Sequence, residues 1–193
     1  ALIPVHLYGQ CVDDAAFDAI ARRQKIAIVE DACQAIGATR GMARAGSFGD
    51  LAAFSFYPTK NLSAAGDAGV VTTNDDALAA RVRRLRVHGS EKRYEHIEVG
   101  LNSRLDALQA VILSIRLRRL AAWNEARLRL ADRYDDLIAA HGIRDRIRPL
   151  RRHEGTHVFH QYIVRVERRD ELRAYLAGLG IGSEVYYPIP LHL

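Results

Sequence analysis

The sequence is short of lysine although it is rich in positive charge. Its only lysines are Lys25, Lys60 and Lys92, and arginine supplies nearly all of the remaining positive charge. Arginine stays protonated in proteins, whereas a lysine amine can lose its proton and attack an electrophile. Lys60 follows a short apolar run and a proline turn, and it precedes a glycine-rich loop. It is therefore a candidate for chemistry that arginine cannot perform.

Other scarce features exclude several classes of protein. The two cysteines, Cys11 and Cys33, lack the density and spacing of a disulfide framework or a zinc site, which favours a reducing cytoplasm. No apolar run approaches the roughly 20 residues of a membrane span, and no charged-then-apolar leader is present. The only methionine is Met42, and the chain starts within a predicted strand. We therefore expect an internal fragment that lacks the N-terminal and extreme C-terminal parts of a longer protein.

The net charge of +5 and the pI near 9.5 favour anionic partners. Nucleic acid, a phosphorylated cofactor and a nucleotide-linked substrate all satisfy this condition. Much of the arginine alternates with leucine in the stretches 116–120 and 127–130, as on the solvated face of an amphipathic helix. No nucleic-acid-binding motif accompanies these stretches. The sequence therefore predicts a phosphorylated small molecule as partner, and neither nucleic acid nor a membrane.

The pattern of apolar residues predicts an α/β protein. Continuous apolar segments, typical of strands covered on both faces of a parallel sheet, occur at 26–29, 51–56 and 69–73. Helical spacing occurs at 13–23 and 75–87, and from 104 to about 140, where one long helix or two are possible. Beyond Gly142 the pattern predicts a small α+β lobe with a strand at 159–166, a helix at 170–179 and a strand at 183–187.

Three polar residues follow the ends of predicted strands. Asp31 follows the strand that starts at residue 26, Ser55 lies near the end of 51–56, and Lys60 follows the turn made by Pro58. In open α/β sheets ligands gather at the carboxyl ends of strands, so these side chains are expected to converge. Pyridoxal phosphate requires an amine for its aldehyde, a carboxylate for its ring nitrogen, and hydroxyl or N–H donors for its phosphate. The three residues meet those requirements.

Several stretches of the sequence also resemble those of a known family. The stretches PVHLYG, IVEDACQAIGA, GSFGDLAAFSFYPTKNLSAAGDAG, RLRVHGS, LNSRLDALQA and YYPIPLHL are similar, in this order, to the DegT/DnrJ/EryC1/StrS family of sugar aminotransferases. The resemblance spans essentially the whole chain. It implies the fold of type I pyridoxal phosphate transferases, with residues 1–95 as part of the large, mostly parallel-sheet domain. Residues 96–145 would form a connecting helical region, and 146–193 part of a smaller C-terminal α+β domain.

The resemblance also implies roles for individual residues. Lys60 would bond to the cofactor aldehyde and carry the proton, Asp31 would pair with the ring nitrogen, and Gln34 would lie by the phenolic oxygen. Ser55 would bind the phosphate, and Asn102 would reach the phosphate from the other subunit of a homodimer. Members of the family transfer an amino group, usually from glutamate, to keto groups of nucleotide-activated sugars. One departure from the family pattern is Ala68, which stands where the loop after the lysine usually has glycine.

Each predicted site residue also has a purely structural interpretation. Lys60 could be an exposed turn lysine, and Ser55 could cap a strand. Asp31 and Gln34 have the Asp-x-x-Gln spacing of a helix capping box. Asn102 could mark the start of the long helix.

Cys33 and the stretch from His153 to His157 could each suggest a reactive or metal-binding site. Cys33 is interpreted as a small packed side chain. The stretch from His153 to His157 spells H-E-x-x-H, the zinc signature of metalloproteases, which needs a helix to bring both imidazoles onto one face. Gly155 and Thr156 are poor helix formers, and a strand-like segment follows. We therefore predict no metal site.

Three functional hypotheses remain. The leading one is a transaminase that acts on a nucleotide-diphospho-keto-sugar. The second is a dehydratase on the same scaffold, which the presence of Lys60 disfavours, because the resembling dehydratases have histidine there. The third is a non-catalytic binding or regulatory protein, or an inactive truncation.

Overall fold

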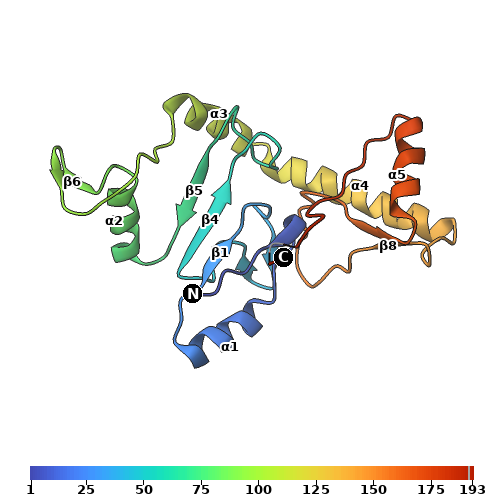
Figure 1. Cartoon of the computed structure of the whole chain (residues 1–193), viewed down its shortest axis with the longest axis horizontal. Helices are drawn as coiled ribbons and strands as arrows, with labels where there is room; N and C mark the ends of the chain where they lie inside the picture. The colour runs from blue at the N-terminus through green and yellow to red at the C-terminus, as the bar shows by residue number, and fades with distance from the viewer. Residues whose placement is uncertain (191) are drawn as a thin grey trace. The chain divides into compact units, whose positions relative to one another are not determined.

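The computed structural model describes residues 1–190 and 192–193, so position 191 of the YYPIPLHL stretch lies outside the described residues (Figure 1). The chain divides into two compact units, and each is described here by itself. The large unit consists of Ala1–Tyr134 and Arg151–Tyr162, and the small unit of Asp135–Leu150 and Ile163–Leu193. None of the helices in the described part of the chain combines the length and apolar character that crossing a membrane requires.

The large unit is built on a three-stranded sheet. Its strands, in the order β1-β4-β5, are β1 (Val29–Asp31), β4 (Leu51–Ser55) and β5 (Gly69–Thr72). In Figure 1, β4 lies between the other two. β1 and β4 are parallel, whereas β5 is antiparallel to β4. The sheet is therefore mixed, because the loop between β4 and β5 contains no crossover helix and simply returns the chain. β5 is an edge strand, and its Val70 and Val71 are exposed.

The first predicted strand is displaced along the chain. We expected it at 26–29, but the structure places β1 at Val29–Asp31, with Ile26 exposed. The Ile28 N–H donates to the Asp50 carboxylate at 2.8 Å instead of to a neighbouring strand. Lys25 has a left-handed backbone, with φ of 51°, which separates the preceding helix from the strand.

A buried carboxylate, that of Glu30, fixes β1 against the loop 46–49. The Glu30 side chain is fully buried and accepts hydrogen bonds of 2.6 to 2.9 Å from three backbone N–H groups of that loop and from His6 Nε2. His6 Nδ1 accepts the Val12 N–H, so its proton is on Nε2. Burial alone raises the pKa of Glu30, but these hydrogen bonds outweigh it and the pKa lies below its ordinary value. The next residue, Asp31, is thereby held at the end of a rigid strand.

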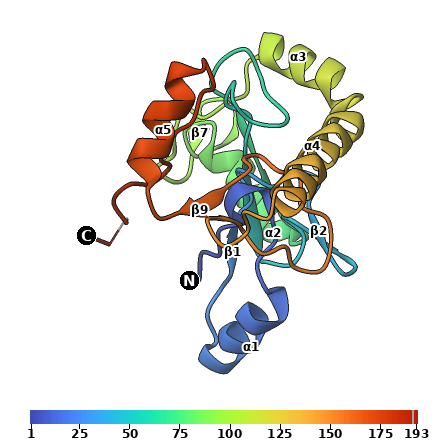
Figure 2. The same ribbon diagram turned by 90° about the vertical axis from the view of Figure 1, so that its right-hand side faces the viewer.

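The remaining elements of the large unit agree closely with the helical pattern. Its helices are α1 (Asp14–Gln24), α2 (Asp76–Leu85), α3 (Ala107–Leu117) and the first part of α4 (Leu120–Ala140). A short 3-10 turn, η1, spans Leu7–Gly9. Two hairpins pair β2 (Thr39–Arg40) with β3 (Ala43–Arg44) and β6 (Ser90–Lys92) with β7 (Glu95–His96). Asp13 and Asp75 cap α1 and α2 through their side chains. Figure 2 shows α1 below β1.

The long helical pattern from residue 104 forms two helices. α3 ends at Leu117, and α4 begins at Leu120. Leu113 and Leu120 are both buried in one cluster with Phe56, Leu62 and Ala64, which follow β4. The chain bends between the two leucines, and both then contact the same part of the core.

The small unit contains the end of α4, one hairpin and the helix α5. β8 (Ile147–Pro149) pairs antiparallel with β9 (Val164–Val166), and α5 spans Arg169–Gly178, close to the predicted 170–179. Two strand predictions are wrong here. Only Val164–Val166 of the predicted 159–166 is a strand, and 183–187 contains none, with Tyr187 at a φ of 54° that a strand does not allow.

Candidate active site

The large unit contains a cavity of about 1180 Å³ that extends along β5, the end of β4 and α2. Three of the predicted site residues, Ser55, Lys60 and Asn102, line it. Asp31 and Gln34 are not among its lining residues. The volume is sufficient for a small-molecule ligand.

The turn after β4 aims Lys60 into this cavity. The Lys60 N–H donates to the Tyr57 carbonyl at 2.9 Å, and the Tyr57 N–H donates to Ser55 Oγ at 3.3 Å. The two following side chains, Asn61 and Leu62, are buried. Because these neighbours point into the core, the half-buried Lys60 side chain is directed to the cavity.

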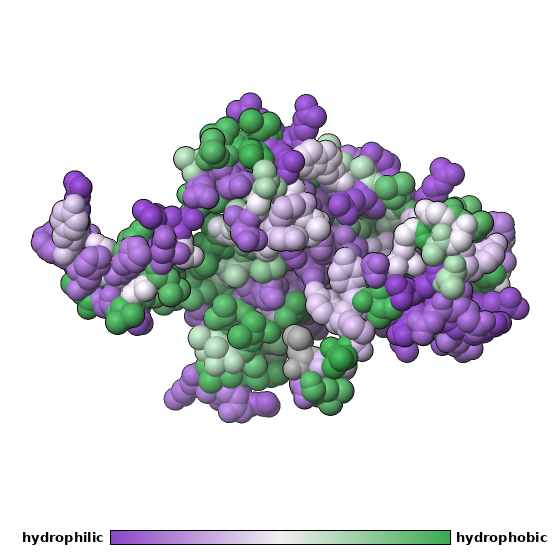
Figure 3. All heavy atoms as spheres, turned by 45° about the horizontal axis from the view of Figure 1, so that its top comes forward, coloured by the Kyte–Doolittle hydropathy of each residue, from purple (hydrophilic) through white to green (hydrophobic). Residues whose placement is uncertain are grey.

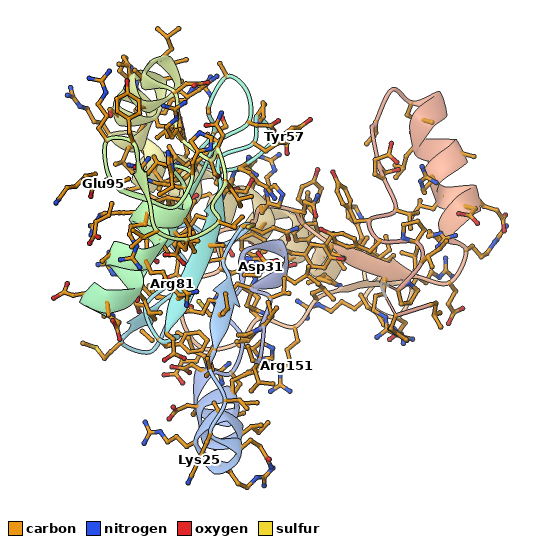
Figure 4. The ribbon with its side chains drawn as sticks, turned by 60° about the vertical axis from the view of Figure 1, so that its left-hand side comes forward. Lys25, Asp31, Tyr57, Arg81, Glu95 and Arg151 are labelled. Carbon is orange, nitrogen blue, oxygen red and sulfur yellow. The ribbon has the colours of Figure 1, made fainter. Side chains whose placement is uncertain are left out.

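Asp31 ends β1 and is paired in register with Ala53 of β4. Figure 4 labels Asp31 at the end of β1 and Tyr57 in the turn beyond β4. One Asp31 oxygen accepts the Cys33 N–H at 3.1 Å, and Gln34 Oε1 accepts the Tyr8 N–H at 2.6 Å. No helix begins at this point, since the chain forms turns up to β2, so these residues do not form a capping box.

Cys33 connects Asp31, at the end of β1, with the neighbouring strand β4. The sequence did not predict this role. Its thiol donates to the Ala53 carbonyl, with 3.7 Å between the sulfur and oxygen atoms. Burial, together with the Asp31 carboxylate, raises the pKa of the thiol to about 11, although the charge of Lys60 and the Ser55 N–H lower it. The Cys33 N–H and thiol thus join Asp31 to Ala53 of β4. Its position two residues after a strand-ending aspartate was the available signal.

Asn102 belongs to an exposed segment on the other side of the cavity. It forms a single antiparallel bridge with Val87, and its Oδ1 accepts a hydrogen bond of 3.2 Å from Arg104 Nε. It does not start a helix, because α3 begins at Ala107 with Asp106 as the preceding residue.

The lining of the cavity carries an excess of positive charge. Its cationic side chains are Lys60, Arg83, Arg86 and Arg104, against a single carboxylate, Asp67. A cavity with this balance attracts anions. The hydroxyl of Ser55 and the amide of Asn102 add hydrogen-bonding groups of the kind that phosphate requires.

The H-E-x-x-H stretch does not have the geometry of a zinc site. Residues 153–157 contain no helix, and Thr156 pairs with Thr39. His157 is stacked on Phe159 at 3.8 Å between ring centroids, and its pKa is lowered to about 4 by burial and by the charge of Arg152. Within residues 1–190 and 192–193, no three His, Cys, Asp or Glu side chains gather around a possible metal position.

Comparison with known proteins agrees with the combination of fold and cavity. The family model of the DegT/DnrJ/EryC1/StrS aminotransferases matches residues 1–193, and the chain therefore belongs to this family. The pleiotropic regulatory protein of Geobacillus stearothermophilus is 48% identical over 194 residues, which cover all of this chain and 52% of that protein. The dTDP-3-amino-3,4,6-trideoxy-alpha-D-glucose transaminase of Streptomyces venezuelae is 47% identical over all of this chain and 50% of its own length.

Solved structures give the same result. The structure of DesV from S. venezuelae in complex with a ketimine intermediate has a TM-score of 0.92 at 45% identity, over all of this chain and 51% of that one. The Bacillus subtilis protein NtdA, solved with the bound cofactor PMP, has a TM-score of 0.87 at 35% identity, over 97% of this chain and 43% of its own. The chain thus spans about half the length of the relatives that it matches.

Proposed function

We propose that the full-length protein is a pyridoxal phosphate-dependent aminotransferase that transfers an amino group, from glutamate, to a nucleotide-diphospho-keto-sugar. The observation that carries this proposal is the position of Lys60. It lines a cationic cavity with Ser55, and Asp31 is paired with Ala53 of the same strand, β4, that ends at Ser55. The transaminase name of the S. venezuelae relative, which is 47% identical, supports the choice of substrate class.

The chemistry of the residues fits the cofactor. Lys60 would provide the amine for the aldehyde, Asp31 the carboxylate for the ring nitrogen, and Ser55 a donor for the phosphate, to which Asn102 of a second copy would add another donor. Gln34 Oε1 accepts the Tyr8 N–H, which fixes the amide next to the end of β1, and Gln34 would lie by the phenolic oxygen of the cofactor. The cofactor, when bound, supplies an electron sink that stabilises negative charge on a substrate carbon.

The protein's own residues would then handle protons and charge. Lys60 Nζ, as a free amine, would remove the α-proton of the amino-acid donor. The carboxylate of Asp31 would keep a proton on the group that it faces. Arg83, Arg86 and Arg104 would balance the negative charge of phosphate groups in the cavity.

We also propose a homodimer with shared active sites. α3 of the large unit exposes an apolar row, Leu108, Val111 and Ile115, whose side chains are 80%, 57% and 61% exposed. Figure 3 shows hydrophobic side chains gathered over α3 at the top of the view. A second copy of the protein would cover this row. Asn102 precedes α3 and would approach the partner's phosphate site.

The domain organisation and location belong to the same proposal. Residues 1–95 would be part of the large cofactor domain of fold type I, 96–145 the connecting helical region, and 146–193 part of the small domain. The enzyme would be cytoplasmic, where Cys11 and Cys33, which are free thiols in the structure, stay reduced.

Borohydride reduction tests the proposal directly. The full-length protein, with its flanking coding sequence restored, is loaded with pyridoxal phosphate, reduced, digested and analysed by mass spectrometry. The pyridoxyl group is expected on the peptide that contains Lys60, and Lys60→Ala should abolish it. Lys92→Ala is the matched control, since Lys92 is exposed in β6 and lies outside the cavity. A label on another lysine, or none, would refute the proposal.

A non-catalytic regulatory protein is the second candidate. The name of the G. stearothermophilus relative, a pleiotropic regulatory protein, favours it. This candidate predicts that the full-length protein takes up no pyridoxal phosphate, which absorbance spectroscopy would detect. The dehydratase alternative remains disfavoured by Lys60, which lines the cavity.

A further inference from the structure

Asn124, near the start of α4, lies between two loops of the large unit. Asn61 Nδ2 donates to Asn124 Oδ1 at 2.9 Å, and Asn124 Nδ2 donates to the Ile36 carbonyl at 3.0 Å. Asn61 directly follows Lys60, and Ile36 lies two positions after Gln34. One side-chain amide therefore joins the turn that carries Lys60 to the loop that carries Gln34.

The neighbours of this amide allow it only one orientation. Asn61 Nδ2 also donates to the Val158 carbonyl at 2.8 Å, and this hydrogen bond is buried. Because a carbonyl group can only accept, the Asn61 atom that faces it is the nitrogen. The Asn124 atom that faces the same nitrogen is then its oxygen, and the Asn124 nitrogen faces the Ile36 carbonyl. Both ends of the Asn124 amide are thus used, one for each loop.

The backbone beside Ile36 leaves room for the Asn124 amide. Gly37 has a φ of 90°, in the left-handed region that favours glycine. A Cβ atom at this position would lie 2.8 Å from Asn124 Nδ2, so a larger residue would displace the amide. The Ile36 side chain also packs against the buried cluster that contains Leu120 of the same helix. The loop is therefore held at α4 by a polar and an apolar contact.

The two loops need such a bridge because both extend beyond the sheet. β1 ends at Asp31 and β4 at Ser55, so strand pairing does not hold the residues that contact Asn124. A ring bonded to Lys60 on one side and paired with Asp31 on the other requires a fixed separation between the turn and the loop. A misplacement of about 1 Å in a reacting group can slow a reaction about a hundredfold.

We propose that Asn124 is a positioning residue, which sets the separation between the Lys60 turn and the loop that follows Asp31. Asn124 does not line the cavity, so it acts through the two loops that it joins. This inference rests on the proposed function, because the separation matters to the reaction only if one ligand contacts both loops.

The first test needs no cofactor. Hydrogen exchange of the full-length, cofactor-free protein is followed by mass spectrometry. Asn124→Ala is expected to raise exchange about tenfold in peptides that cover 32–38 and in those that cover 57–64, because each loop loses a hydrogen bond. Arg116→Ala is the matched control. Arg116 of α3 donates to Ser63 and Ala64, so this variant should raise exchange at 57–64 alone.

A second variant separates the two ends of the amide. Asn124→Asp keeps an oxygen that accepts from Asn61, but it loses the donor to the Ile36 carbonyl. Exchange should therefore rise at 32–38 and stay within about twofold of wild type at 57–64. This variant also tests the bridge if Asn124→Ala does not fold. Unchanged exchange at 32–38 in the folded variants would overturn the proposal.

The second test asks whether the change reaches the cofactor. The visible circular dichroism of bound pyridoxal phosphate depends on how the protein holds its ring. At saturating cofactor, and without denaturant where urea titration shows the variant to be folded, Asn124→Ala should reduce this signal. It should also slow single-turnover reaction with the amino donor about tenfold, while the donor concentration at half-maximal rate changes little. A lowered urea midpoint with an unchanged signal and rate would show a purely structural role and overturn the proposal.

The two proposals fail in distinguishable ways. If borohydride labels no lysine in the wild-type protein, the proposed function is wrong whatever the exchange data show. If Lys60 is labelled but Asn124→Ala leaves exchange at 32–38 or the cofactor signal unchanged, only the positioning role is wrong.

Discussion

Lys60 and Asn102 line the same cavity, but the two residues that follow Lys60 are buried, whereas the residues around Asn102 are exposed. Asn61 and Leu62 are 7% and 3% exposed, whereas Leu101 and Leu105 are 69% and 41% exposed. One side of the cavity is therefore fixed by the core of the large unit. The other side presents apolar residues to solvent, as a surface does that is completed by another part of the protein or by a second copy.

The largest loss of stability is expected from a change on the buried side of the large unit, at Glu30. Glu30→Gln removes the charge that receives four hydrogen bonds, and we expect a loss of about 3 kcal/mol in the free energy of unfolding of the full-length protein. Urea denaturation measures this loss. Glu125→Gln, which removes an exposed ion pair with Arg129, is the control and should cost less than about 0.5 kcal/mol. A loss no larger than the control's would contradict the role of Glu30.

The same carboxylate predicts a pH dependence. Because the folded-state pKa of Glu30 lies below its ordinary value of 4.5, its contribution is fully present above the unfolded-state pKa and is lost as the pH falls through the folded-state pKa. The stability of the wild-type protein should therefore fall more steeply than that of Glu30→Gln as the pH is lowered below about 4.5. Parallel pH profiles of the two proteins would contradict this.

A smaller effect is expected at the turn itself. Asn61→Ala removes two hydrogen bonds, to Val158 and Asn124, and should cost about 2 kcal/mol of stability. It should also slow borohydride trapping at Lys60, because the turn is less well fixed. Differential scanning calorimetry and mass spectrometry give the two values. Normal trapping together with reduced stability would show that the turn does not orient Lys60.

On the exposed side of the cavity, a change at Asn102 should weaken cofactor binding without lowering the stability of the protein. Asn102→Ala is expected to change the free energy of unfolding by less than about 0.5 kcal/mol, while it weakens cofactor binding about tenfold through the lost donor. Mixing inactive Lys60→Ala with Asn102→Ala subunits tests whether sites are shared, because one mixed site would then combine two intact residues. In the mixed dimers the site that keeps Lys60 is expected to bind the cofactor with wild-type affinity, and binding that stays about tenfold weaker there would place both residues in one chain's site.

The smallest effect is expected at Cys33. Cys33→Ala replaces one small side chain by another, and its cost should be below about 1 kcal/mol, with trapping at Lys60 within about twofold of wild type. Denaturation and mass spectrometry again provide the measurements. A larger loss of trapping would mean that the thiol itself, rather than its position, contributes to the site.

Local signals in the sequence were sufficient for much of the fold. Asp13 and Asp75 mark the starts of α1 and α2, and the apolar runs before Ser55 and after Gly69 mark β4 and β5. Side chains and backbone from distant positions decided the rest. The Asp50 carboxylate shifts β1, and the Gln161 N–H bonds to the Tyr8 carbonyl within the predicted strand 159–166.

The candidate site shows the same division. Lys60, Ser55 and Asp31 follow strand ends, which a sequence reveals, and Gln34 and Asn102 were suggested only by family resemblance. Cys33 was not predicted, since nothing in its immediate neighbours indicates that its thiol contacts β4. That contact depends on packing between segments that are far apart along the chain.

The free edge of β5 has a practical consequence. Only one side of this strand is paired within the described residues, and Val70 and Val71 beside it are exposed. An open row of backbone donors and acceptors is a template on which any extended peptide can add a strand. Expression of residues 1–193 alone would therefore favour insoluble multimers, whereas a segment that pairs along β5 should cap the template and keep the product in solution.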